Sequence, residues 1–199
     1  MHGRACKGLL RKETKMAATP PVCDFGWKAV GFTLRDASGA EYRLTDIAGP
    51  NGTLVMFICN HCPYVKSVAG RIAATTAALQ QDGVSSVAIM ANDYDSYPDD
   101  APSKMMEFAD RHGFEFPYLV DEDQTVARAY GAACTPDFFG FNAALELQYR
   151  GRLDESGRAA VPDAKPELLE AMRAIAATGV GPRDQTASIG CSIKWHQAA

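Results

Sequence analysis

The hydrophobic positions of this chain follow two different spacings, and together they predict an α/β protein. Residues 54–58 and 87–90 are continuous apolar runs, which are typical of strands buried on both faces of a sheet. Between them, apolar residues recur at helical spacing from 65 to 79. A strand, a helix and a second strand in this order predict a right-handed βαβ unit.

The segments around this unit supply the rest of a predicted sheet and its helices. Residues 32–35 and 42–44 alternate apolar and polar side chains about a turn that ends at Gly39, which predicts a hairpin near the N-terminus. The other predicted elements are a helix that Gly113 ends, an extended segment at 116–120, a short helix from Asp123 to Gly131, strands at 138–141 and 145–149, and a helix from Pro166 to Gly179.

Length, composition and charge restrict the class of protein. The chain has 199 residues, of which 47% are hydrophobic and 22% charged, so it is long enough for one domain with a full core and too apolar for a disordered protein. The formal net charge of −4 offers no general attraction to nucleic acid or to an anionic membrane. The longest apolar run, 54–59, is too short to cross a bilayer. We therefore expect neither nucleic acid nor membrane as a partner.

The charge pattern divides the chain into three parts. Residues 1–18 are strongly basic but lack the apolar run of a secretory signal, so we expect a disordered basic extension. Residues 19–179 carry the predicted domain. Residues 180–199 form a tail in which Ile193 and Trp195 are too apolar for a free end, so we expect this tail to pack on the domain. Without an export signal, the predicted location is the cytoplasm.

Of the six cysteines, Cys59 and Cys62 are separated by two residues, Asn60 and His61. In a reducing compartment, thiols are more often catalytic, metal-binding or buried than part of structural disulfides. This CxxC follows a predicted central strand and precedes a predicted helix, where the helix N-terminus favours a thiolate. We expect Cys59 to be the solvent-facing nucleophile and Cys62 the more sheltered thiol that resolves a mixed disulfide.

With these residues in view, the chain resembles the thioredoxin-like fold and, within it, the redoxin group that includes the alkyl hydroperoxide reductase/thiol-specific antioxidant (AhpC/TSA) family. The matching motifs are Phe32-x-Leu34-x-Asp36-x-x-Gly39, the CxxC, Phe116-Pro-Tyr-Leu-Val-Asp121 and Thr135-Pro136. The resemblance implies a central mixed β-sheet flanked by helices. It also implies a cis Pro136 that faces the CxxC, with the backbone of Thr135 pairing with the substrate chain. Asn60 is the second predicted substrate contact.

Two departures from the family pattern bear on the activity. Peroxiredoxins have a Thr three residues before a lone reactive Cys, whereas the residue three before Cys62 is Cys59 and position 56 is Met. Thioredoxins carry a Trp before the first Cys, where this chain has Ile58. The resemblance therefore favours a thiol–disulfide oxidoreductase with its own substrate. A thiol-dependent peroxidase is the second interpretation.

His61 precedes the second cysteine, as in the CPHC site of the oxidising enzyme DsbA. By that resemblance an imidazolium lowers the pKa of Cys59 and stabilises the reduced pair. We therefore predict a couple more oxidising than thioredoxin's, at about −270 mV.

Two further cysteines have two interpretations each. Cys134 precedes Thr135, so it is either a third redox thiol or, more simply, a small buried side chain. Cys191 is either a second resolving thiol or an anchor of the tail. Cys59, His61, Cys62 and Cys134 could together hold Zn²⁺ or Cu(I), which makes a metal-binding module the third interpretation.

The oxidoreductase interpretation needs no bound cofactor. Its partners would be a thiol or disulfide substrate, either a protein or a small molecule, and a thiol system that recycles the site. A last feature is an acidic stretch at 93–123, which we interpret as solvated surface because it lacks the spacing of a calcium loop.

Overall fold

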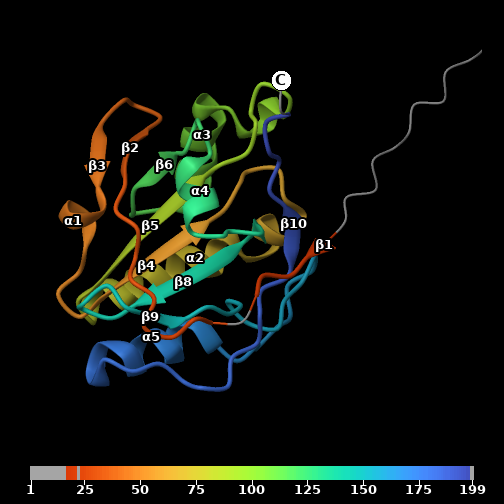
Figure 1. The fold of residues 1–199 in the computed structure, drawn as a ribbon. Helices are drawn as coiled ribbons and strands as arrows, with labels where there is room; N and C mark the ends of the chain where they lie inside the picture. Colours follow the sequence, from red (N-terminus) through yellow and green to blue (C-terminus); the bar gives the residue numbers. More distant parts are fainter. Residues whose placement is uncertain (1–16, 22, 198–199) are drawn as a thin grey trace, which may run out of the picture.

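The computed structural model of the chain describes residues 17–21 and 23–197 (Figure 1). The predicted extension 1–18 therefore lies almost wholly outside the described residues. In chain order the elements are β1 (Ala17–Ala18), β2 (Thr33–Asp36), β3 (Glu41–Arg43), α1 (Leu44–Ile47), β4 (Gly52–Phe57), α2 (Pro63–Gln81), β5 (Val84–Met90), the 3₁₀ helix η1 (Pro98–Asp100), α3 (Pro102–His112), β6 (Tyr118–Val120), α4 (Thr125–Ala129), β7 (Cys134–Thr135), β8 (Asp137–Phe141), β9 (Leu147–Tyr149), α5 (Glu167–Thr178) and β10 (Gly190–Ser192).

A seven-stranded mixed sheet forms the centre of the domain, in the order β3-β2-β6-β5-β4-β8-β9. The β4, β5 and β6 strands are parallel, which confirms the predicted βαβ unit. The β8 strand pairs antiparallel with β4, and β2 and β3 form the predicted hairpin. Every residue of β4 is buried, as its unbroken apolar run requires of a strand covered on both faces.

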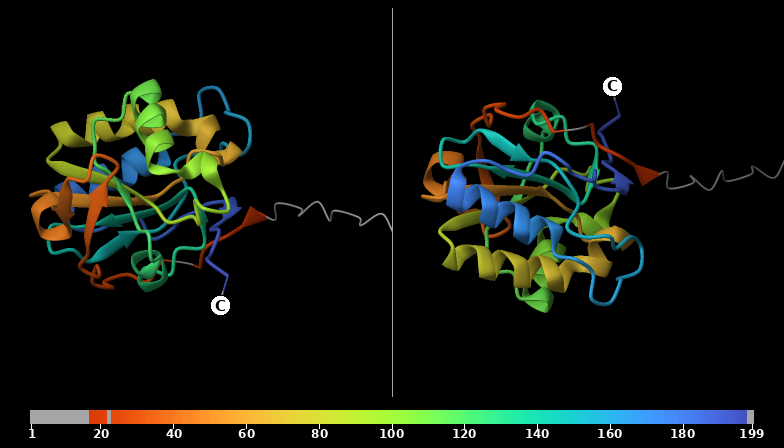
Figure 2. Two further views of the ribbon diagram at one scale, coloured as in Figure 1. Left: turned by 90° about the horizontal axis from the view of Figure 1, so that it is seen from above. Right: turned by 90° about the horizontal axis from the view of Figure 1, so that it is seen from below.

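The two faces of the sheet have separate apolar cores because successive side chains of a strand point to opposite sides. Leu54 and Met56 of β4 pack on the side of α2, α3 and α5. Val55 and Phe57 pack on the side of α1 and α4. Figure 2 shows α2 and α3 on one side of the sheet and α4 on the other. This three-layer arrangement confirms the predicted α/β class.

A second, three-stranded sheet was not predicted. The β10 strand of the tail lies between β1 and β7 and is antiparallel to both. It lies beside β1, at the side of the molecule away from the β2–β3 hairpin (Figure 1). Because Ala17 and Ala18 pair with β10, the predicted boundary of the basic extension at residue 18 is wrong by at least two residues. No helix in the described part of the chain is long and apolar enough to span a membrane.

Candidate active site

The CxxC lies between β4 and α2, at the carboxyl edge of the parallel strands. Cys59 comes two residues after the end of β4, and Cys62 is the residue that caps the N-terminus of α2. Pro63, the first helical residue, has no N–H to leave unsatisfied and favours a helix start here. The thiols of both cysteines are free. Open α/β sheets place their reactive groups at this edge.

Both sulfur-bearing residues are closed off from solvent. Cys59 and Cys62 are each 0% exposed, and Cys191 of β10 is buried in the same apolar cluster. The expectation of a solvent-facing Cys59 is therefore wrong for this state of the molecule. A local helix-start argument could not anticipate it, since Cys191 comes from a strand about 130 residues further along the chain.

Thr135 contacts both cysteines from the opposite side of the site. Its hydroxyl oxygen lies 3.3 Å from the sulfur of Cys59, and its carbonyl oxygen accepts a hydrogen bond from the S–H of Cys62 (3.0 Å). The Thr135–Pro136 peptide bond is cis, as the resemblance implies. Pro136 also lines a small hollow together with Ser188 and Ile189 of the tail.

A buried carboxylate, Asp100 of η1, holds the loop between the two cysteines. One oxygen accepts hydrogen bonds from the backbone N–H groups of Asn60 (2.8 Å) and His61 (3.1 Å). The other accepts from the side chain of Asn92 (2.8 Å) and lies 2.5 Å from Nδ1 of His61. Burial opposes its ionisation, but the hydrogen bonds from His61 and Asn92 hold the pKa of Asp100 below its ordinary value.

The acidic stretch is thus not uniformly a solvated surface. Asp93, Asp100 and Asp121 are buried, and Asp121 accepts from the backbone of α4. The interpretation of 93–123 as surface is wrong for these three residues. Composition could not separate them from their exposed neighbours, because a buried acid is identified by its partners.

His61 faces Asp100 more closely than it faces a cysteine. Its Nδ1 lies 3.9 Å from the sulfur of Cys59, and its ring stacks on Tyr97 at 5.7 Å between centroids. Asn60 is also turned inward: its side chain donates to the Asp99 carbonyl and accepts from the hydroxyl of Tyr118. In this closed state Asn60 fixes the loop and is not available to a substrate.

The surroundings of the two sulfurs reverse the predicted order of acidity. Burial, the hydrogen bond to Cys62 and the nearby Asp100 carboxylate raise the pKa of Cys59 well above its ordinary value. The hydrogen bond from Cys59 lowers the pKa of Cys62 to about 4 against the effect of burial, and the N–H groups of Cys191 and Val65 lower it further. Of the two sulfurs, Cys62 is therefore the more readily ionised, and on losing its proton it gives up the hydrogen bond that its S–H donates to the Thr135 carbonyl. The pKa of Cys59 is raised, so the expectation that His61 lowers it is wrong here.

The two remaining candidate thiols are placed differently. Cys191 lies in the same buried cluster as Cys62, and its backbone N–H and side chain help to lower the pKa of Cys62. Cys134 is buried too, but its S–H donates to the Pro136 carbonyl (3.4 Å), and burial raises its pKa. The structure thus brings Cys191 into the site and gives Cys134 the surroundings of a small buried side chain.

Among the described residues, one group of three could hold a metal ion, formed by Cys59, His61 and Asp100. Their ligand atoms lie within 4.8 Å of one another. The Nδ1 atom of His61 is hydrogen-bonded to Asp100, whereas its Nε2 atom is buried without a hydrogen-bond partner. The metal-binding interpretation stays a prediction.

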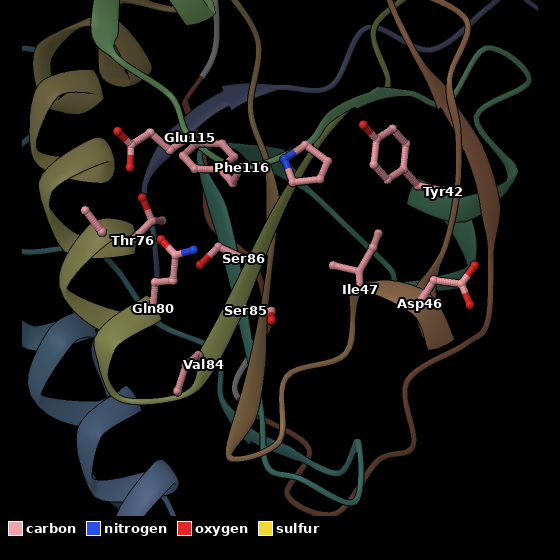
Figure 3. A pocket seen from close by; sticks show the side chains of 12 residues that line it. Tyr42, Asp46, Ile47, Thr76, Gln80, Val84, Ser85, Ser86, Glu115 and Phe116 are labelled. Atoms are coloured by element: carbon pink, nitrogen blue, oxygen red, sulfur yellow. The ribbon is translucent and has the colours of Figure 1, made fainter.

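A hollow at the other edge of the sheet has a different character (Figure 3). It lies between α2, which contributes Thr76 and Gln80, and the side of the domain that carries Tyr42 and Asp46. Its lining has no cysteine or histidine. Its lining carries hydroxyl and carboxyl side chains but no thiol, so the candidate redox site is the cysteine cluster.

Comparison with known proteins identifies the family of this chain. The model of the AhpC/TSA family matches residues 25–154. The chain belongs to the AhpC/TSA family. The same fold occurs in the thioredoxin domain of a thiol–disulfide oxidoreductase from Bacteroides vulgatus, with a TM-score of 0.55, 14% identity, and coverage of 65% of this chain and 89% of that one. The predicted thioredoxin-like fold and redoxin family are confirmed.

Three individual proteins show how far the similarity extends. An uncharacterized conserved protein from Geobacillus kaustophilus has a structure with a TM-score of 0.87 and 41% identity, covering 92% of this chain and 98% of that one. The thiol–disulfide oxidoreductase ResA of Halalkalibacterium halodurans is 27% identical over 111 residues, or 56% of this chain and 58% of its own length. A Mycobacterium tuberculosis protein with a provisional peroxiredoxin name is 27% identical over 136 residues, 68% of this chain and 82% of its own.

Proposed function

We propose that this AhpC/TSA-family protein is a thiol–disulfide oxidoreductase that cycles between the Cys59/Cys62 dithiol and its disulfide. The observation that carries the proposal is the placement of two free thiols against one residue at the helix start: the sulfur of Cys59 lies 3.3 Å from the Thr135 hydroxyl and that of Cys62 lies 3.0 Å from the Thr135 carbonyl. In this setting the pKa of Cys62 is lowered and that of Cys59 is raised. A thiolate is the nucleophile of thiol–disulfide exchange, and an adjacent thiol completes the reaction. The oxidoreductase relatives support the same chemistry.

The reaction can be written with these residues. The Cys62 thiolate attacks one sulfur of a substrate disulfide, which forms a mixed disulfide and releases the other substrate sulfur as a thiolate. That thiolate takes the proton of Cys59. The Cys59 thiolate then attacks Cys62, forming the Cys59–Cys62 disulfide and releasing the second substrate sulfur. One disulfide is reduced to two thiols while two protein thiols are oxidised, and the reverse sequence oxidises a substrate.

Two neighbours position this pair. The Thr135 hydroxyl can donate to the Cys59 thiolate that forms in the second step, since the two atoms lie 3.3 Å apart. Asp100 fixes the backbone of the intervening loop through Asn60 and His61. Neither residue is consumed in the cycle.

A disulfide-containing fluorogenic peptide in a glutathione buffer tests the proposal. We expect wild-type protein to accelerate exchange, whereas Cys59→Ser and Cys62→Ser each lose at least about 100-fold, because an exchange cycle needs both sulfurs. Cys134→Ser is the matched control, a buried cysteine near the site that should retain full activity. Equal activity of Cys62→Ser and the control would contradict the proposal.

A thiol-dependent peroxidase is the second candidate. It is favoured by the place of Cys62 at a helix N-terminus with a lowered pKa, and by the relative with a provisional peroxiredoxin name. In that reaction Cys62 would be oxidised to a sulfenic acid and Cys59 would condense with it to the disulfide, releasing water. Stopped-flow mixing with hydrogen peroxide separates the two, since a peroxidase reacts far faster than a free thiol.

The physiological partners follow from this chemistry as proposals. They are a thiol or disulfide substrate and a thiol system that restores the starting redox state. The cytoplasmic location stays a prediction.

A further inference from the structure

The tail strand β10 places Cys191 on the same face as the active site. Cys191 lies directly opposite Thr135 in the antiparallel pairing of β10 and β7. Directly opposed residues point to the same face of a sheet, and the Thr135 hydroxyl on that face contacts Cys59. The next pair along, Ser192 and Cys134, points to the other face. The register therefore directs the side chain of Cys191, and not that of Cys134, to the face of the active site.

Cys191 also shares the buried surroundings of the reactive pair. It is 2% exposed and belongs to the same apolar cluster as Cys59 and Cys62. Its backbone N–H and its side chain help to lower the pKa of Cys62. Three thiols thus lie in one buried cluster.

The close approach of the tail depends on Gly190. A Cβ at this position would overlap the Thr135 carbonyl and the nitrogen of Pro136, so a larger residue could not lie here without displacing the strand. An extended segment that pairs with a short strand beside a reactive group is the way in which many proteins bind a peptide by β-augmentation. Here the segment belongs to the chain itself.

Beyond β10, the tail is anchored to the loop network that holds the CxxC. The N–H of Lys194 donates to the side-chain oxygen of Asn92 (2.8 Å), whose amide donates to Asp100. The carbonyl of Lys194 accepts from the N–H of Asp93 (2.8 Å) and from the side chain of Gln124 (2.8 Å). These contacts hold Cys191 in place against Cys62.

We propose that Cys191 is a third redox-active thiol, which exchanges with the active-site pair to form an internal Cys62–Cys191 disulfide. This inference rests on the proposed function, since it starts from the Cys59–Cys62 disulfide that the oxidoreductase cycle produces. β10 then occupies the place of a substrate strand, with Cys191 as the substrate's cysteine.

The step balances without another oxidant. The Cys191 sulfur attacks Cys62, the Cys59–Cys62 bond breaks as the Cys62–Cys191 bond forms, and the proton of Cys191 passes to the departing Cys59 thiolate. One disulfide is exchanged for another, so no electrons leave the protein. The result is a free Cys59 beside a tail that is covalently held.

Trapping with glutathione disulfide tests this step. Trypsin then places the CxxC, Cys134 and Cys191 in three different peptides, so a cross-link between them can be identified by mass. Cys59 and Cys62 lie in the peptide 44–66, Cys191 in 184–194 and Cys134 in 129–150. In Cys59→Ser protein, Cys62 attacks glutathione disulfide and becomes glutathionylated. Cys191 then displaces glutathione, so we expect 44–66 cross-linked to 184–194 as the main product. In Cys59→Ser/Cys191→Ala protein, glutathione should remain on Cys62.

The control and the wild-type protein keep the result interpretable. Cys59→Ser/Cys134→Ala should give the same cross-link as Cys59→Ser, because Cys134 faces away. If Cys59→Ser retains glutathione on Cys62 as fully as the Cys191→Ala double variant, the proposal is overturned. Wild-type protein distinguishes this from failure of the proposed function: a disulfide within 44–66 alone supports the oxidoreductase and not the relay. If neither the disulfide within 44–66 nor the cross-link to 184–194 forms, the proposed function and the exchange with Cys191 are both contradicted.

Discussion

The two edges of the parallel strands show what separates a reactive site from a hollow in this domain. At the carboxyl edge, three buried thiols and the buried carboxylate of Asp100 lie with the half-buried imidazole of His61, and Asp100 accepts several hydrogen bonds. At the amino edge, the larger hollow of Figure 3 is bordered by the exposed Glu115 and Asp46, with no thiol or imidazole in its lining.

The two edges differ in whether their polar side chains are buried and hydrogen-bonded or exposed to water. A charge that remains in water keeps its ordinary behaviour, whereas a buried one depends on the groups that face it. At the carboxyl edge those groups shift a proton from one cysteine to its neighbour. The hollow at the amino edge has no cysteine pair in which such a shift could occur. Four predictions follow from this contrast, and three of them have a control variant at a position outside the cysteine cluster.

The largest expected effect is on the titration of Cys62. Because its pKa lies at about 4, reduced wild-type protein should retain the ultraviolet absorbance of one thiolate at neutral pH and lose it only as the pH falls through about 4. Cys62→Ser should lack this absorbance at neutral pH, and Cys134→Ser should keep it. If the thiolate absorbance of wild-type protein instead disappears below about pH 8, Cys62 has the pKa of an ordinary cysteine and the prediction is contradicted.

The second effect concerns the buried carboxylate. Asp100→Ala leaves the N–H groups of Asn60 and His61 and the amide of Asn92 without their acceptor, which should lower the free energy of unfolding by about 3 kcal/mol. Glu115→Ala, at the open edge, should change it by less than about 0.5 kcal/mol. Urea unfolding measures both free energies of unfolding. Equal decreases in the two variants would contradict the claim that the carboxyl edge depends on a buried carboxylate and the amino edge does not.

Asp100 also fixes the direction of a pH effect. Its pKa is lowered in the folded protein, so its contribution to stability is present above the unfolded pKa of about 4 and is lost as the pH falls through the lower folded value. Acid should therefore narrow the stability difference between wild-type and Asp100→Ala protein. A difference that widens in acid would show that the pKa of Asp100 is raised in the folded protein.

The smallest effect concerns access. Gly190→Ala should push β10 away from Thr135, so the alkylation of Cys59 and Cys62 by iodoacetamide under native conditions should rise by roughly tenfold, corresponding to about 1.4 kcal/mol of lost closure. Gly31→Ala is the control, since a Cβ there meets no atom within 4 Å. If both variants react at the wild-type rate, the tail is not what closes the site.

Local sequence patterns were enough to predict the main sheet and the helices around it. The unbroken run at 54–58 and the helical spacing from 65 to 79 gave β4 and α2, because both depend on burial that repeats along the chain. The CxxC was also visible, since its place at a helix start is a local property. The apolar Ile193 and Trp195 indicated a docked tail.

The parts that escaped prediction depend on distant residues. Strands as short as β1, β7 and β10 have no periodicity to detect, and their pairing joins residues far apart in the sequence. Asp100 looks like any other acid of its stretch until its four partners are known. The reversed acidity of Cys59 and Cys62 arises in part from the N–H of Cys191, which the local motif does not contain.

The central claim is that Cys59 and Cys62 form a working redox couple, and a glutathione redox titration of metal-free protein tests it most directly. Alkylation and peptide mass spectrometry would report the oxidation state of 44–66 at each potential. We predict that Cys59 and Cys62 oxidise together at one midpoint. The stabilised Cys62 thiolate favours the reduced state, so the midpoint should be more oxidising than the −270 mV or so of thioredoxin. Two cysteines that remain unlinked across the whole range would contradict the account and favour the metal-binding alternative.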